Sequence, residues 1–185
     1  MCAESQNSEK IQQEKESMGN ARVIAEQVLE AVRDSIQPFA DQVMLANGRL
    51  ELLLSDVSGE TDWKILGEVI VLPQSMHEDG SGYFMDIFLM LTSQPVEGMR
   101  EEIITGLAEL NQLALFGTVT LNENGQLCYG ARFPVNGDDP EHEAERFSFV
   151  MCEMRSFLDV FYPYLLRLGV KPQQSSLQSY LEQIL

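Results

Sequence analysis

The sequence predicts an α+β fold, a two-layer sandwich with helices on a five-stranded, mostly antiparallel sheet. The expected order is α-β-β-β-α-β-β-α plus a short C-terminal helix. Residues 115–135 alternate apolar and polar side chains around an Asn-Glu-Asn-Gly turn, which is the pattern of a β-hairpin. The segments that flank this hairpin repeat apolar residues every three or four positions, as amphipathic helices do. A hydrophobic content of 44% over 185 residues is enough for one domain with a sizeable core.

Composition divides the chain into three parts. Residues 1–19 are polar and lack apolar periodicity, so we expect a disordered or loosely helical tail. Residues 20–170 are expected to form the single α+β domain, beginning with a helix that Asn20 caps and Pro38 ends. Residues 171–185 are expected to contain the amphipathic C-terminal helix.

Three strands are expected after the first helix. They cover residues 44–55, 64–72 and 83–92, and polar, glycine-bearing loops separate them. Asn47-Gly48 indicates a kink or a turn at the start of the first of these strands. The third strand has apolar residues on both faces, so we expect it to be a central strand.

Two longer helices complete the domain. One covers residues 96–115 and precedes the hairpin, and the other covers residues 141–168 and follows it. Pro163 lies within the apolar pattern of the second and is expected to kink that helix or to end it near Tyr162.

Charge and cysteine usage limit the classes of function. The net charge of −17 and the pI of about 4.3 disfavour nucleic acid, whose binding depends on Lys and Arg at phosphates. Anionic membrane surfaces are disfavoured for the same reason. The three cysteines are scattered and odd in number, which indicates a reducing compartment. Without a spanning apolar run or a signal peptide, we expect a cytoplasmic protein.

No residue pattern indicates catalysis, a cofactor or a metal. His77 and His142 lie among acidic residues but lack the spaced partner that a metal motif supplies, so solvated side chains are the simpler interpretation. Cys128 and Cys152 have no adjacent cation that would activate a thiol. We therefore expect no enzymatic activity and no cofactor.

Asp86 is the one unusual ionisable residue, because it lies in the middle of the apolar segment YFMDIFLML. It could be an acid with a raised pKa in a pocket, in which case His77 and Arg132 would have to converge on it and the domain would bind a small molecule or be an enzyme. Alternatively, Asp86 faces an open sheet surface or pairs with Arg49, Lys64 or Arg132 on a neighbouring strand. We favour the second interpretation, since cross-strand charge pairs are common.

The sheet face opposite the helices raises the question of what covers it. Leaving an apolar sheet in water costs about 25 cal/mol per Å². The third helix, a second subunit or a bound segment of another protein could cover it. The C-terminal helix is too short to be stable alone and must likewise dock on its own domain, a second subunit or a partner. The residues expected at a partner or dimer interface are Phe88, Met90, Phe161, Leu177, Leu181 and Ile184.

A family resemblance supports the binding interpretation. Its residues are Phe116-Gly117, then Val119, Leu121, Gly125, Leu127, Tyr129 and Phe133, then Phe157 and Phe161-Tyr162-Pro163. This run, in its predicted order of elements, resembles the type III secretion chaperone-like fold, which includes the Tir-type chaperones and the YbjN-type proteins. The resemblance covers about residues 21–168. It implies a small cytoplasmic protein, usually dimeric, that binds segments of other polypeptides and has no enzymatic activity.

Overall fold

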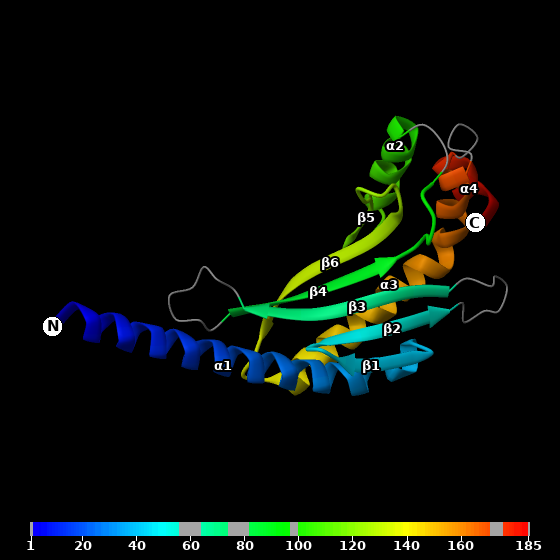
Figure 1. Ribbon diagram of the computed structural model, residues 1–185. Helices are drawn as coiled ribbons and strands as arrows, with labels where there is room; N and C mark the ends of the chain where they lie inside the picture. The colour runs from blue at the N-terminus through cyan, green and yellow to red at the C-terminus, as the bar shows by residue number, and fades with distance from the viewer. Residues whose placement is uncertain (1, 56–63, 74–81, 97–99, 171–175, 185) are drawn as a thin grey trace.

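A computed structural model describes residues 2–55, 64–73, 82–96, 100–170 and 176–184, and of residues 2–18 and 169–170 it describes the backbone alone. The fold is α+β, as predicted, but the sheet has six strands instead of five. Figure 1 shows the sheet with helices packed behind and below it.

The additional strand comes from the segment that was expected to be one strand. This segment forms a hairpin in which β1 (Gln42–Ala46) and β2 (Arg49–Ser55) pair antiparallel. Asn47 and Gly48, with φ of 52° and 73°, form the two-residue turn between them. Positive φ at both positions is what a type I′ hairpin turn requires, and Asn-Gly is strongly preferred there. Asn47-Gly48 therefore makes a turn instead of a kink, and the expected strand count was wrong for this reason.

The six strands form one antiparallel sheet in the order β1-β2-β3-β4-β6-β5. The bounds are Lys64–Pro73 for β3, Gly82–Met90 for β4, Thr118–Leu121 for β5 and Leu127–Asn136 for β6. The β5–β6 hairpin is the one predicted at residues 115–135. The strand β4 lies in the interior of the sheet between β3 and β6, as its apolar sequence predicted.

Two long helices cover one face of the sheet. They are α1 (Cys2–Ile36) and α3 (Pro140–Val170), and they pack against each other. The helix expected from Asn20 continues back to Cys2, and its first half projects beyond the sheet in Figure 1. The predicted apolar stripe of the third helix is largely buried, including Phe147, Met151 and Leu158.

The proline in α3 does not end the helix, which continues through Pro163 to Val170. Contacts on both sides of the proline hold the backbone helical. The hydroxyl of Tyr162 donates a hydrogen bond of 2.9 Å to the carbonyl of Leu91, and Tyr164 is 1% exposed. Tertiary packing here outweighs the local cost of proline in a helix.

The remaining helices are α2 (Arg100–Asn111), α4 (Leu177–Ile184) and η1, a short 3₁₀ helix at Gln37–Phe39. Helix α2 packs beside β5 and α4 packs on α2 and α3, whereas η1 contacts α1 and α3 just before β1. Helix α4 docks on its own chain, which was one of the three arrangements expected. Tyr180 is buried there, with its ring 5.6 Å from that of Tyr164.

One buried cation joins the helical layer to the sheet. Arg155 on α3 is 8% exposed, and its guanidinium donates hydrogen bonds to the carbonyls of Phe39 and Ser55. The Arg155 side chain thereby links the last residue of β2 to the end of η1.

Candidate interaction surfaces

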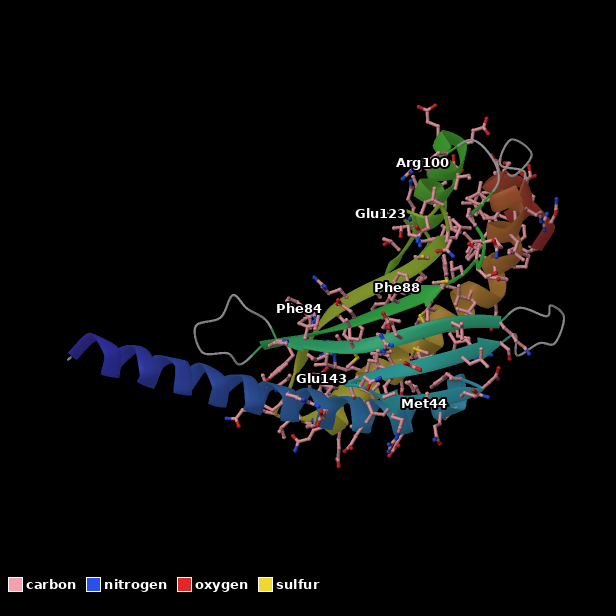
Figure 2. All side chains as sticks on the ribbon, in the orientation of Figure 1. Met44, Phe84, Phe88, Arg100, Glu123 and Glu143 are labelled. Atoms are coloured by element: carbon pink, nitrogen blue, oxygen red, sulfur yellow. The ribbon has the colours of Figure 1, made fainter. Side chains whose placement is uncertain are left out.

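Both long helices lie on the same side of the sheet, so the other side, here called the open face, is left uncovered by the described residues. In Figure 1 the strands lie in front of α3, and Figure 2 labels Met44, Phe84 and Phe88 on the side facing the viewer. Strand register sets this face, because Met44, Glu51, Glu68 and Phe88 are successive cross-strand partners. The exposed or half-buried apolar side chains on the open face are Met44, Leu53, Leu66, Ile70, Leu72, Phe84, Phe88 and Met90.

Asp86 lies on the open face and not in a closed pocket. Its two carboxylate oxygens accept hydrogen bonds from Nε and Nη2 of Arg132, both at 2.6 Å. The register opposes the two residues across β4 and β6, so this is one of the cross-strand pairs that the sequence allowed. The bidentate contact with Asp86 raises the pKa of the Arg132 guanidinium. The same guanidinium lies 5.6 Å from the ring centroid of Phe84.

A second charge cluster on the open face is also internally paired. Arg49 contacts Glu68 at 3.1 Å and Glu51 at 3.2 Å. In total the strand positions on this face carry three basic residues, Arg49, Lys64 and Arg132, and three acidic residues, Glu51, Glu68 and Asp86. The open face is therefore charge-balanced, and the net charge of −17 lies elsewhere in the chain.

The open face is hollowed beside Gly130. A depression of about 690 Å³ lies between the Asp86–Arg132 pair, Phe88 and Thr118. Gly130 contributes no side chain there, and a Cβ built on it would come no closer than 4.0 Å to another group, the carbonyl of Ile87. The missing side chain of Gly130 therefore helps to leave this part of the open face hollow.

The residues predicted at an interface fall into two groups. Phe88, 39% exposed, and Met90 lie on the open face. The other four lie in or beside the contact of α3 with α4: Phe161 packs 6.3 Å from Tyr180, Leu177 is buried, Leu181 is half-buried and Ile184 is exposed. Leu177 and Leu181 thus dock α4 on its own domain, whereas Ile184 does not contribute to this packing.

A second apolar surface, which the sequence did not indicate, lies between α3 and the segment that joins α2 to β5. We call it the Phe149 groove. Phe149 is 58% exposed and packs edge-to-face on Phe116, with centroids 5.9 Å apart and planes at 87°. Leu115 is 75% exposed. Two cavities of about 210 and 390 Å³ meet at Phe116, and they continue to Phe157 on one side and Phe133 on the other.

Side-chain hydrogen bonds from β6, and between α2 and β5, hold the segment that carries Leu115 and Phe116. The hydroxyl of Tyr129 donates a hydrogen bond to the carbonyl of Phe116, and burial raises the pKa of Tyr129 to about 12. The side-chain amide of Asn111 donates to the carbonyl of Val119 at 2.9 Å and accepts from its N–H at 2.8 Å. Both ends of the segment are therefore anchored.

The remaining candidates for chemistry are two histidines and two cysteines. His142 is exposed at the start of α3, and His77 lies outside the described residues. Cys128 is buried, which raises the pKa of its thiol, and Cys152 is exposed. Within the described part of the chain, no group of three His, Cys, Asp or Glu side chains is arranged to hold a metal.

Comparisons with protein-family models, with curated proteins and with solved structures found no match to this chain. Over the described ranges, none of the helices combines the length and the apolar character needed to cross a membrane.

Proposed function

We propose that this chain is a non-catalytic protein-binding module, and that its open face is closed by a second copy of itself. The observation that carries the proposal is the composition of that face, which is apolar and charge-balanced on a strongly acidic molecule. A role in binding other polypeptides is also what the resemblance to the secretion chaperone-like proteins implies.

The distribution of charge favours a second copy of the chain as the partner that covers the open face. Two chains of net charge −17 repel each other over most of their surfaces. At the open face this repulsion is least, because Asp86 is matched by Arg132 and Glu68 by Arg49. A strongly basic partner would gain little from a neutral face and would favour the acidic surfaces elsewhere.

The size of the face suits a stable dimer. Six strands spaced by about 4.8 Å, with lengths of 7–10 residues for β2–β4, give a face of about 24 by 25 Å, or roughly 600 Å² in projection. Its accessible area is larger, because side chains stand out of the sheet. A standard interface buries about 800 Å² on each partner. A two-fold axis near the centre of the face would place Phe88 of each copy beside the hollow of the other.

A ligand-binding or enzymatic site near Asp86 is the alternative. It is less well supported, because both oxygens of the Asp86 carboxylate are occupied by Arg132. The Arg132 side chain is itself 62% exposed, so the pair lies at an open surface.

Light scattering at two protein concentrations tests the proposal. We expect the wild-type chain to give twice the monomer mass of 20.8 kDa. Leu66→Asp and Phe88→Asp should give the monomer mass, since each would place an unpaired charge in the dimer interface. Both residues are exposed in the single chain, at 66% and 39%, so the variants should remain folded.

Leu115→Asp is the matched control, because it adds the same charge at a more exposed leucine that lies off the open face. It should leave the dimer intact. A monomeric wild type, or a dimer that survives both open-face substitutions, would refute the proposed interface.

A further inference from the structure

The Phe149 groove has a pattern of charge that the open face lacks. Along α3, Glu145, Phe149 and Glu153 are spaced four residues apart, so they follow one another along one side of the helix. Both carboxylates line the cavities of the groove, and neither has an ion-pair partner among the described residues. An exposed aromatic ring thus lies between two carboxylates that no described cation neutralises.

The basic side chain in the groove does not neutralise these carboxylates. Arg146 contacts both oxygens of the buried Glu143, at 2.9 and 2.8 Å, and its other terminal nitrogen donates to the carbonyl of Pro134 at 3.4 Å. Its charge is therefore already compensated. The groove presents apolar surface and unpaired acid together.

We infer that the Phe149 groove binds an amphipathic segment of another protein, in which apolar anchors are flanked by Lys or Arg. Leu115, Phe116 and Phe149 would receive the apolar anchors, while Glu145 and Glu153 would pair with the basic residues. The inference deepens the proposed function, because it names the chemistry of the polypeptide that is bound, but it uses a different surface from the dimer.

A second copy of this chain fits the groove poorly. The chain has 29 acidic and only 12 basic residues, so its own exposed segments would bring further negative charge to Glu145 and Glu153. A basic segment gains from the same field, both in the complex and in the rate of encounter.

Fluorescence anisotropy with a labelled 14-residue peptide of leucine and lysine, its leucines at helical spacing, tests the inference. We expect saturable binding that weakens as salt is raised. A peptide with glutamate in place of lysine should bind at least tenfold more weakly. Leu115→Ser and Phe149→Ser, which leave the charge of the protein unchanged, should each weaken binding of the leucine–lysine peptide at least tenfold. Phe149→Tyr should restore most of it.

A matched pair of double variants separates the groove from the general acidity of the chain. Glu145→Gln with Glu153→Gln should weaken binding about fivefold and flatten its salt dependence. Glu30→Gln with Glu101→Gln removes the same charge from exposed sites on α1 and α2 and should change binding less than twofold. Equal loss in both double variants, unchanged binding in the two serine variants, or no saturable binding by the wild type would overturn the inference.

Light scattering on the same samples keeps the two proposals distinct. The serine variants are expected to remain dimeric, so lost peptide binding at unchanged mass reports on the groove alone. A monomeric wild type that still binds the peptide through Phe149 would refute the proposed dimer and leave this inference standing.

Discussion

Gly117 offers a sharp test of how the Phe149 groove is built, because no other residue fits its position. It has φ of +68°, and a Cβ built there would lie 2.5 Å from the carbonyl oxygen of Gly130 and 2.7 Å from the hydroxyl of Tyr129. Both atoms belong to β6, and the hydroxyl already holds the carbonyl of Phe116. Gly117→Ala must therefore move the strand or break that hydrogen bond.

The expected cost has two parts. Alanine in the left-handed region costs about 1 kcal/mol. Overpacking against backbone and a buried ring adds about 2 kcal/mol. Gly48→Ala is the matched control, since Gly48 has φ of +73° but nothing within 4 Å of the added Cβ. Gly48→Ala should lower the free energy of unfolding only by the conformational cost, about 1 kcal/mol.

Equilibrium unfolding in urea measures both variants. With a slope of about 2 kcal/mol per M, Gly117→Ala should lower the midpoint by about 1.5 M and Gly48→Ala by about 0.5 M. Gly117→Ala should also weaken binding of the leucine–lysine peptide, because the substitution displaces the segment that carries Leu115 and Phe116. Equal midpoints for the two variants would refute the steric part of the reasoning.

Two further predictions concern buried ionisable groups. Glu143 is 1% exposed, accepts a hydrogen bond of 3.0 Å from the N–H of Asn136 and pairs with Arg146. Glu143→Gln should therefore lower the free energy of unfolding by about 1–3 kcal/mol. The control, Glu145→Gln, should change it by less than about 0.5 kcal/mol. Similar values for the two variants in urea would contradict this. Burial raises the pKa of Tyr129 from 10.0 to about 12, so above pH 10 the unfolded chain releases this proton first and stability should fall between pH 10 and 12. Tyr129→Phe should lessen that fall, and an unchanged slope would show that Tyr129 does not cause it.

The sequence predicted the elements with strong periodicity and missed those that tertiary contacts decide. The alternation of residues 115–135 gave the β5–β6 hairpin. Asn47-Gly48 is as strong a hairpin signal, but it was interpreted as a kink or a turn at the start of one strand over residues 44–55, and the structure makes it the turn between two strands. Of the two effects expected of Pro163, the end of the helix near Tyr162 was wrong, because buried neighbours on both sides hold the backbone helical to Val170.

The candidate surfaces were predicted only in part. The open face followed from the two-sided apolar pattern of β4, and Phe88 and Met90 lie on it. Phe149 was not predicted as a surface residue, because its neighbours Phe147, Val150 and Met151 are core positions. Helical periodicity alone does not show which residues at the edge of an apolar stripe are buried and which are exposed. Leu115 lies in a segment whose sequence suggested the end of a helix. Only the fold brings that segment to α3.

The distribution of charge connects the two surfaces. A chain with a uniform net charge of −17 would be soluble but would have no preferred site of self-association. Here the strand positions of the open face carry no net negative charge, while Glu145 and Glu153, which have no ion-pair partner in the described part of the chain, flank Phe149 in the helical layer. A dimer closed through the sheet would hold the helices outward and present two Phe149 grooves, one on each side. A partner with two basic amphipathic segments on a linker that spans both grooves would then bind more tightly than either segment alone, with no new contact required.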